Sequence, residues 1–389
     1  MVSLIVRIIK VSNVAFQKLS FRILISLGLL MIASVSSFAG DHKTLPIGSP
    51  APDFNLPGID GKMVSLSSFA KARILVIIFT CNHCPTAQAY EDRIIKLTTD
   101  YDPQGVAVVA IMPNDPKSLR LDELDFSDLG DSYDEMKIRA REKKFNFPYL
   151  YDGENQKVSE AYGPVATPHV FVFDEKRILR YAGRFDNMEN PYKTATSHDA
   201  RDAIEAILHN QNISNPSTKV FGCSIKWAEK RETVSRALEK WAKEPVSLET
   251  IKADSLYNFI HSSAEKLKLI YCWNLDCEAC AKSFPEFITI NRMYRDRDFE
   301  FISINMDKTG LSERVLDFLK NNQASNKNYQ SEDGFSEKLI ELDRSWNGRL
   351  PLTLLVEPGG KLVYQFQGLI DPAALKKTIV GNHMIGRYP

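Results

Sequence analysis

The chain has 389 residues, of which 44% are hydrophobic and 25% are charged, and its 49 basic side chains balance its 49 acidic ones. A chain of this length predicts two or three globular domains. The zero formal net charge gives no support for a nucleic-acid partner, so we expect none. The six cysteines are too few for a disulfide scaffold, but four of them form two C-x-x-C pairs, which indicates thiol chemistry or metal binding.

The first forty residues have the pattern of an export signal. Four basic residues precede an apolar run at 23–32, and Ala39 ends a small-x-small cleavage site. The apolar run is shorter than the ~20 residues that a membrane span needs. We therefore expect a signal peptide at residues 1–39 and a periplasmic or otherwise extracytoplasmic location, and an uncleaved N-terminal membrane anchor is the alternative.

Strand and helix patterns alternate over residues 45–210, which we expect to form a first domain. The apolar runs at 74–79 and 106–112 are typical of parallel strands that are covered on both faces. A helix should begin after Cys84, because Pro85 is well tolerated in a first turn. The other elements expected here are a helix at 133–145, a strand at 149–151, a hairpin at 169–182 and a helix at 199–209.

The same order of elements returns in residues 251–389, which predicts a second domain. An apolar strand at 267–273 precedes Cys277 and Cys280, and a helical pattern follows them. The repeat is a duplicated architecture rather than a chance pair of motifs. Its remaining elements are a strand at 299–304, a hairpin at 352–366 and a helix at 372–380.

Two segments lie outside these repeated elements. Residues 211–250 would connect the domains and contain an amphipathic helix at 225–242. Residues 113–132 form an acidic, turn-rich insertion near the first cysteine pair. Such an insertion either recognises a partner or is a solvated loop.

Both repeats resemble thioredoxin-fold domains, an α/β fold in which helices flank a mixed β-sheet. The first half contains "FTCNHCPTAQAYEDRI" and "AYGPVATPHVFVFD" and resembles the redoxin branch of this fold, the peroxiredoxin-like AhpC/TSA group. The second half contains "CWNLDCEACAKSFPEF" and "LPLTLLVEPGG" and resembles TlpA-like extracytoplasmic thioredoxins. The resemblance implies a thiol–disulfide oxidoreductase that acts on protein dithiols and disulfides, with a membrane electron donor or cytochrome c maturation components as candidate partners.

Disulfide exchange needs a thiolate, whereas a free cysteine is mostly protonated near neutral pH. A helix N-terminus favours the anion through its unpaired N–H groups and the positive end of the helix dipole. We expect the first cysteine of each pair, Cys81 and Cys277, to lie there and to act as the nucleophile. Cys84 and Cys280 would follow one turn later and release the mixed disulfide as resolving thiols.

The residues between the cysteines should tune the two sites in opposite directions. A protonated His83 would stabilise a neighbouring thiolate and make the first site more oxidising. Glu278 would disfavour the thiolate of Cys277 and make the second site more reducing. This predicts electron transfer from the second pair to the first, and the alternative for His83 is a partly exposed spacer.

Two prolines stand where thioredoxin-fold proteins carry a cis-proline that faces the cysteines. Thr167 precedes Pro168 and Leu350 precedes Pro351, in each case just before a predicted hairpin. A cis peptide bond there would leave the backbone of the preceding residue free to pair with an extended substrate. The alternative is a proline that only begins an edge strand.

The two remaining cysteines have less specific surroundings. Cys223 is either an extra resolving thiol for Cys81 or a small buried residue, and Cys272 ends an apolar strand and should belong to the core. A four-thiolate zinc site is disfavoured because Cys84 and Cys277 lie far apart, each within its own repeat. We expect neither a metal nor an organic cofactor.

Two other functions remain open. A thiol peroxidase would fit the resemblance of the first half, but the P-x-x-x-T-x-x-C pattern in which peroxiredoxins activate their cysteine is absent at Cys81 and at Cys84. Arg93 and Arg184 are the candidates for an activating cation there. A non-catalytic binding or chaperone module would also fit the fold, although both cysteine pairs are intact.

Overall fold

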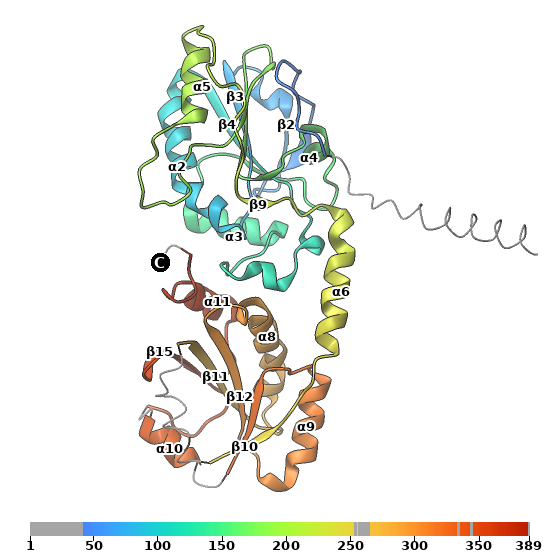
Figure 1. Cartoon of the computed structure of the whole chain (residues 1–389), viewed down its shortest axis with the longest axis vertical. Coiled ribbons are helices and arrows are strands. Elements are labelled where there is room, and N and C mark those ends of the chain that lie inside the picture. Colours follow the sequence, from blue (N-terminus) through green and yellow to red (C-terminus); the bar gives the residue numbers. More distant parts are fainter. Residues whose placement is uncertain (1–41, 253–254, 256–264, 333–334, 343–344, 388–389) are drawn as a thin grey trace, which may run out of the picture. The chain divides into compact units, whose positions relative to one another are not determined.

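The computed structural model describes residues 42–252, 255, 265–332, 335–342 and 345–387 (Figure 1). The described residues all lie within one compact unit, His42–Pro389. The predicted signal peptide at residues 1–39 lies outside the described residues. In the part of the chain that is described, no helix combines the length and the apolar character that a membrane crossing requires. Below, residues 42–230 are called the first half and residues 231–387 the second half.

A five-stranded sheet forms the centre of the first half, in the order β5-β4-β3-β7-β8. Strands β3, β4 and β5 are parallel, while β7 pairs antiparallel with both β3 and β8. Every residue of β3 is buried, as expected for an apolar run that is covered on both faces. The strands span Ile74–Phe79 (β3), Val106–Met112 (β4), Tyr149–Tyr151 (β5), His169–Phe173 (β7) and Leu179–Gly183 (β8).

Both faces of this sheet are covered. Helices α2, α3 and α5 pack on the face that contains Val76 and Ile78, whereas α4 and the β1–β2 hairpin pack on the face that contains Leu75 and Ile77. Alternate residues of β3 thus enter two hydrophobic clusters. The bounds are Asn55–Pro57 (β1), Met63–Ser65 (β2), Pro85–Tyr101 (α2), Tyr133–Lys143 (α3), Lys157–Tyr162 (α4) and Asp199–Leu208 (α5).

A six-stranded sheet forms the centre of the second half, in the order β10-β13-β12-β11-β14-β15. The first four strands are parallel to one another, and β14 is antiparallel to β11 and β15. The sequence did not predict β10 or β13, because one is very short and the other is largely polar. The strands span Glu249–Ile251 (β10), Leu267–Trp273 (β11), Phe299–Asn305 (β12), Lys327–Ser331 (β13), Leu352–Glu357 (β14) and Lys361–Gln367 (β15).

Helices also flank the second sheet on both faces. Helices α8, α9 and α11 contribute to the hydrophobic cluster on one face, and α10 contributes to the cluster on the other. Mixed sheets flanked by helices in both halves confirm the predicted α/β fold class. The helices span Glu278–Tyr294 (α8), Ser312–Asn321 (α9), Phe335–Leu342 (α10) and Pro372–Val380 (α11).

The connection between the sheets differs from the predicted amphipathic helix at 225–242. Helix α6 spans only Arg231–Ala242. The residues before it fold onto the first half, where β9 (Cys223–Ser224) pairs with β6 (Ala166–Thr167) and Trp227 is buried. Residues 225–227 alternate between apolar and charged side chains, and over so short a stretch this pattern suits an extended segment as well as a helix. The predicted helix therefore began too early.

The insertion at 113–132 is not a solvated loop. Its residue Leu124 packs in a hydrophobic cluster of the second half, and Tyr294 of α8 donates a hydrogen bond to the carbonyl oxygen of Ser127. Asp131, near the end of the insertion, is fully buried. The insertion therefore forms part of the packed structure and reaches the first cysteine pair.

Candidate active site

The first cysteine pair lies between the end of β3 and the start of α2. Cys84, not Cys81, is the N-cap of α2, and its Sγ atom accepts a hydrogen bond from the backbone N–H of Ala87 at 3.4 Å. Pro85 occupies the first helical position, where no backbone donor is needed. The prediction that Cys81 lies at the helix N-terminus and Cys84 one turn later is therefore wrong, because the helix begins only after Cys84.

The Thr167–Pro168 peptide bond is cis, as predicted, and Thr167 contacts both sulfur atoms. Thr167 Oγ1 lies 3.0 Å from Cys81 Sγ, and Cys84 Sγ lies 3.4 Å from the carbonyl oxygen of Thr167. All three side chains are buried. Thr167 thus fixes the two thiols against the segment that carries the proline.

A buried hydrogen-bond network holds His83. Its Nδ1 atom lies 2.6 Å from Oδ2 of Asp131, and that oxygen also accepts a hydrogen bond from Asn114 Nδ2 at 2.7 Å. The other carboxylate oxygen accepts the backbone N–H groups of Asn82 and His83 at 2.9 and 3.1 Å. His83 is only 2% exposed, so it is not a partly exposed spacer.

The network favours the positively charged form of His83 beside the thiols. Burial by itself would lower the pKa of His83 and raise the pKa of Asp131. The opposite charge of each residue and the hydrogen bond between them outweigh burial, so the pKa of His83 is raised and the pKa of Asp131 is lowered. Burial also opposes ionisation of Cys84, but hydrogen bonds from the thiols of Cys223 and Cys81 and the charge of His83 lower its pKa well below the usual range. Burial raises the pKa of Cys81, whereas two backbone N–H groups, of Ala87 and Cys223, point at the Sγ atom of Cys84, so we assign the thiolate of the first pair to Cys84.

Cys81, His83 and Asp131 also form a group of potential metal ligands, with donor atoms that all lie within 4.8 Å of one another. Each carboxylate oxygen of Asp131, however, already accepts two hydrogen bonds. A metal ion would have to replace some of them. The arrangement therefore fits a hydrogen-bonded histidine better than a metal centre.

Cys223 lies beside Cys84. Strand β9 places it opposite Thr167, and its backbone N–H donates to Cys84 Sγ at 3.3 Å. Its side chain is partly buried and packs against the core of the first half. The sequence named Cys81 as the thiol that Cys223 would resolve, whereas the structure places Cys223 in hydrogen-bond contact with Cys84.

Two residues of this site, Asp131 and Asn114, were not predicted from the sequence. Asn114 comes just after β4, which is the parallel neighbour of β3, the strand that leads to the cysteines. A polar residue at the carboxyl end of this strand was the signal by which the sequence could have indicated a site residue. Asp131 comes from the insertion, and no local pattern connects it with His83. Only the folded chain brings these three side chains together.

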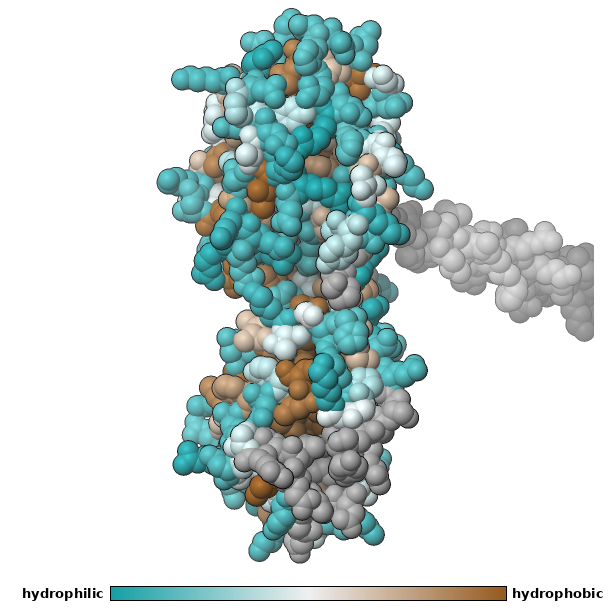
Figure 2. Space-filling view, turned by 90° about the vertical axis from the view of Figure 1, so that its left-hand side faces the viewer, coloured by the Kyte–Doolittle hydropathy of each residue, from teal (hydrophilic) through white to brown (hydrophobic). Residues whose placement is uncertain are grey.

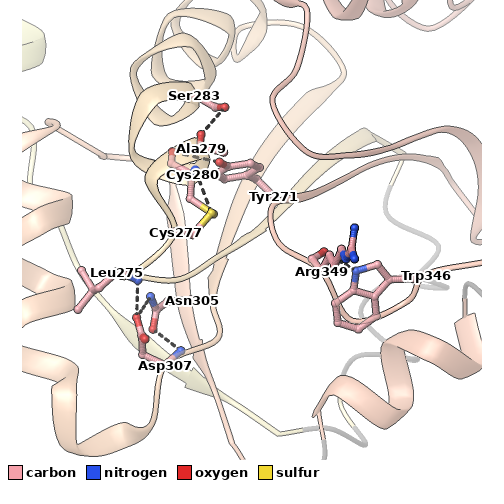
Figure 3. Close-up of a disulfide and its surroundings, with 10 residues drawn as sticks. All are labelled: Tyr271, Leu275, Cys277, Ala279, Cys280, Ser283, Asn305, Asp307, Trp346 and Arg349. Atoms are coloured by element: carbon pink, nitrogen blue, oxygen red, sulfur yellow. Dashed lines mark hydrogen bonds between the residues drawn. A yellow bond between two sulfur atoms is a disulfide. The ribbon is translucent and has the colours of Figure 1, made fainter.

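The second cysteine pair has the geometry that the sequence predicted. Cys277 is the N-cap of α8, Cys280 lies in its first turn, and the backbone N–H of Cys280 donates to Cys277 Sγ at 3.0 Å. The two cysteines form a disulfide (Figure 3). Cys277 is partly exposed and Cys280 is buried, so an incoming group reaches Cys277 first.

Hydrogen bonds fix the loops around the second pair. The carboxylate of Asp307 accepts from Leu275 N at 2.8 Å and from Asn305 Nδ2 at 2.9 Å (Figure 3). The Leu350–Pro351 peptide bond is cis, as predicted, and Gly368 N donates to the carbonyl oxygen of Pro351 at 2.9 Å. In both halves, therefore, a C-x-x-C pair follows one strand and a cis-proline precedes the neighbouring strand of the same sheet.

Glu278 lies on the surface beside the second pair. Its carboxylate is 2.7 Å from Lys282 Nζ, and this hydrogen bond lowers the pKa of Glu278. The charge of Glu278 is therefore shared with Lys282 and exposed to solvent, which weakens the expected effect on Cys277.

The other predicted residues lie away from the reacting sulfurs. Arg93 pairs with Asp186 at 2.6 Å and Arg184 pairs with Asp199 at 2.9 Å, so both predicted cations are engaged elsewhere and His83 supplies the charge. Cys272 is buried in β11, as predicted, and burial raises its pKa to about 12.

Comparison with known proteins gives a family match within the first half. The model of the AhpC/TSA family matches residues 47–182. Similar solved structures include a hypothetical protein from Sinorhizobium meliloti 1021, which is 31% identical, with 48% of this chain and 97% of that chain covered and a TM-score of 0.43. An uncharacterized conserved protein from Geobacillus kaustophilus is 35% identical, with 48% and 94% covered and a TM-score of 0.43.

A third similar structure is the thioredoxin domain of a thiol-disulfide oxidoreductase from Bacteroides vulgatus. It is 19% identical, with 35% of this chain and 86% of that chain covered and a TM-score of 0.29. The search among curated proteins gave no match. The resemblance of the second half to TlpA-like thioredoxins stays a prediction. Residues 47–182 therefore form a redoxin domain of the AhpC/TSA type with a thioredoxin-like fold.

Proposed function

We propose that the chain is an exported thiol–disulfide oxidoreductase that exchanges disulfides with protein partners through both C-x-x-C pairs. One observation carries the proposal, and it holds in each half. A buried strand is followed by a helix whose N-cap is a cysteine, and a cis-proline precedes the strand that pairs with that buried strand. The helix N-terminus stabilises a thiolate there. A single pair in this position would be weaker support than the same arrangement built twice.

The reaction needs only sulfur atoms and protons. A thiolate, at Cys84 or Cys277, attacks one sulfur of a partner disulfide, which forms a mixed disulfide and releases the partner's other sulfur as a thiolate. The second cysteine of the pair then attacks the mixed disulfide, and the partner leaves as a dithiol. The pair is oxidised by two electrons and the partner is reduced by two, and the reverse sequence oxidises a partner.

The surroundings of the second pair suit a protein partner. Cys277, Leu275 and Leu350 are partly buried and pack against the same hydrophobic cluster. Leu369 is 57% exposed and follows Gly368, whose N–H donates to the carbonyl oxygen of Pro351. Figure 2 shows hydrophobic residues gathered on the surface of the second half. Exposed apolar side chains on the half that carries Cys277 favour binding of a polypeptide. A membrane electron donor and cytochrome c maturation components are the candidate partners.

Export and cleavage are part of the proposal. The basic and apolar segments before Ala39 motivate them. Mass spectrometry of the chain from the extracytoplasmic fraction should show a mature form that begins near Gly40. A chain of full length in the membrane fraction would instead support the uncleaved anchor, and one confined to the cytoplasm would contradict export.

Trapping the mixed disulfide tests the exchange. Full-length Cys280→Ser, reduced and then mixed with insulin as a test disulfide, should accumulate a covalent adduct at Cys277 that dithiothreitol releases. The matched variant Cys277→Ser/Cys280→Ser lacks both thiols of this site and should form no adduct in the second half. Absence of an adduct in Cys280→Ser would contradict disulfide exchange at the second pair.

A thiol peroxidase is the second candidate for the first pair. The observation that favours it is enclosure: Cys81 is 3% exposed and Cys84 is 0% exposed, which suits a small oxidant. The Cys84 thiolate would attack a peroxide, forming a sulfenic acid and releasing an alcohol or water after protonation, and the Cys81 thiol would then form a disulfide and release water. Peroxide consumption that Cys84→Ser abolishes and Cys272→Ser preserves would support this activity.

A further inference from the structure

The first site differs from the second in what lies beside its cis-proline. Strand β9 pairs antiparallel with β6, so that Thr167 is opposite Cys223 and Ala166 is opposite Ser224. This is the backbone edge at which an extended substrate was predicted to pair. The chain's own segment therefore occupies the position predicted for a substrate strand.

The approach of this segment is very close. Gly222 has φ +137°, and a Cβ atom added to it would lie 2.0 Å from the carbonyl oxygen of Thr167. Only glycine fits there, for both conformational and steric reasons. The next residue, Cys223, then directs its N–H to Cys84 Sγ at 3.3 Å.

Contacts that follow Cys223 hold the segment in place. Ile225 and Trp227 are buried. Lys226 N donates to Asn114 Oδ1 at 2.9 Å, and Lys226 Nζ donates to Glu123 at 2.6 Å. The segment is thus anchored through the insertion that also carries Asp131, next to the reacting sulfurs.

The second site has no equivalent strand in the described part of the chain. The edge strands of its sheet are β10 and β15, and among the described residues no strand pairs with the segment at Leu350. The covering segment is therefore specific to the first site, and so is a third cysteine beside the pair.

We infer that residues 222–224 act as an internal substrate strand and that Cys223 is a third exchange thiol whose partner is Cys84. The inference deepens the proposed function and rests on it. Starting from a Cys81–Cys84 disulfide, the thiolate of Cys223 attacks Cys84 Sγ and forms a Cys84–Cys223 disulfide. The Cys81 sulfur leaves as a thiolate and takes the proton that Cys223 lost, so no net electrons are transferred.

The exchange frees the Cys81 thiol and links β9 covalently to Cys84. A protein partner that reduces the Cys84–Cys223 disulfide would release both thiols. Cys84 therefore alternates between two partners, and its Sγ atom accepts the backbone N–H groups of Ala87 and Cys223.

Oxidised glutathione tests the assignment in full-length Cys81→Ser. The Cys84 thiolate attacks the glutathione disulfide and releases one glutathione, and Cys223 then displaces the second. Non-reducing peptide mass spectrometry should find Cys84 linked to Cys223 and Cys272 unmodified. Each link should release two molecules of reduced glutathione from one molecule of oxidised glutathione. The matched variant Cys81→Ser/Cys223→Ser should instead keep glutathione on Cys84.

The outcomes separate the inference from the proposed function. If Cys81→Ser keeps glutathione on Cys84 while Cys223 remains a free thiol, the third-thiol assignment is wrong but exchange at Cys84 stands. If glutathione reacts with Cys84 in neither variant, exchange at the first pair fails and the inference fails with it.

A glycine substitution tests the role of the strand without removing a cysteine. In the Cys81→Ser background, Gly222→Ala should displace β9 and slow formation of the Cys84–Cys223 link by about tenfold or more, because alignment of the reacting atoms is lost. Gly310→Ala is the matched control, since a Cβ atom there meets nothing within 4 Å. An unchanged rate in Gly222→Ala would overturn the assignment of β9 as an internal substrate strand.

Discussion

Nδ1 of His83 lies 2.6 Å from Oδ2 of Asp131, and both side chains are buried. A buried ion pair is costly to break, because the remaining charge is left without a partner. Here the pair lies next to Cys84, the N-cap of α2, so one contact serves both the stability of the first half and the charge state of its thiols.

Asp131→Ala should lower the free energy of unfolding by about 3–5 kcal/mol, because it leaves the His83 imidazolium unpaired in the interior. Asp134→Ala is a matched control: this carboxylate is exposed on α3 and pairs with Lys137 at 2.9 Å. Its loss should cost less than about 1 kcal/mol. Urea unfolding of the full chain measures both, and equal costs would contradict the buried pair.

His83→Gln should show when the pair contributes to stability. The native pKa of His83 is raised above its ordinary 6.5, so its contribution is complete below pH 6.5 and declines as the pH rises through the native pKa. The native pKa of Asp131 is lowered below its ordinary 3.8, so its contribution is complete above pH 3.8 and declines as the pH falls through the native pKa. The difference in unfolding free energy between wild type and His83→Gln should therefore be largest from pH 3.8 to 6.5. A difference that does not vary with pH would show that the pair is not ionised.

The first cysteine pair should have a higher reduction potential than the second. The His83 imidazolium stabilises the thiolate of Cys84, and therefore the reduced form of the pair. His83→Gln should lower the potential of the first pair by about 30 mV or more, whereas Glu278→Gln should leave the second pair close to wild type, because Glu278 is exposed and paired with Lys282. Glutathione redox titrations with peptide-resolved alkylation measure both potentials. A lower potential at the first pair would rule out electron flow from the second pair to the first.

Leu369→Ser should weaken recognition of protein disulfides. Leu369 is 57% exposed and follows Gly368, which is hydrogen-bonded to Pro351. Loss of the apolar contact that Leu369 would make with a bound insulin chain should reduce kcat/KM for insulin reduction by about threefold to tenfold. Leu362→Ser is the matched control, since Leu362 is 39% exposed but pairs with Val356, toward the other end of the same hairpin. Equal effects of the two changes would contradict a binding role for Leu369.

The parts of the structure that the sequence predicted well depend on local patterns. Buried parallel strands appear as apolar runs, so β3, β4 and β11 were found with accurate bounds. The two cis-prolines and the position of Cys277 at a helix tip were also predicted. In each case a few adjacent residues carry the physical signal.

The parts that the sequence could not predict depend on contacts between distant residues. Residue spacing is the same in C-N-H-C and C-E-A-C, yet α8 begins directly after Cys277 while α2 begins only after Cys84. The backbone N–H groups of Asn82 and His83 donate to Asp131, which holds the intervening turn out of the helix. Such a tertiary contact leaves no mark on local periodicity, and the same holds for the pairing of Cys223 with Thr167.

Reduction of insulin by the full-length chain, with dithiothreitol as the electron source, is the most direct measurement of disulfide exchange. The account predicts a rate well above that of dithiothreitol alone, reduced by Cys277→Ser and lost in Cys84→Ser/Cys277→Ser, while Cys272→Ser retains the wild-type rate. A wild-type rate equal to that of dithiothreitol alone, or an unchanged rate in the double variant, would contradict it.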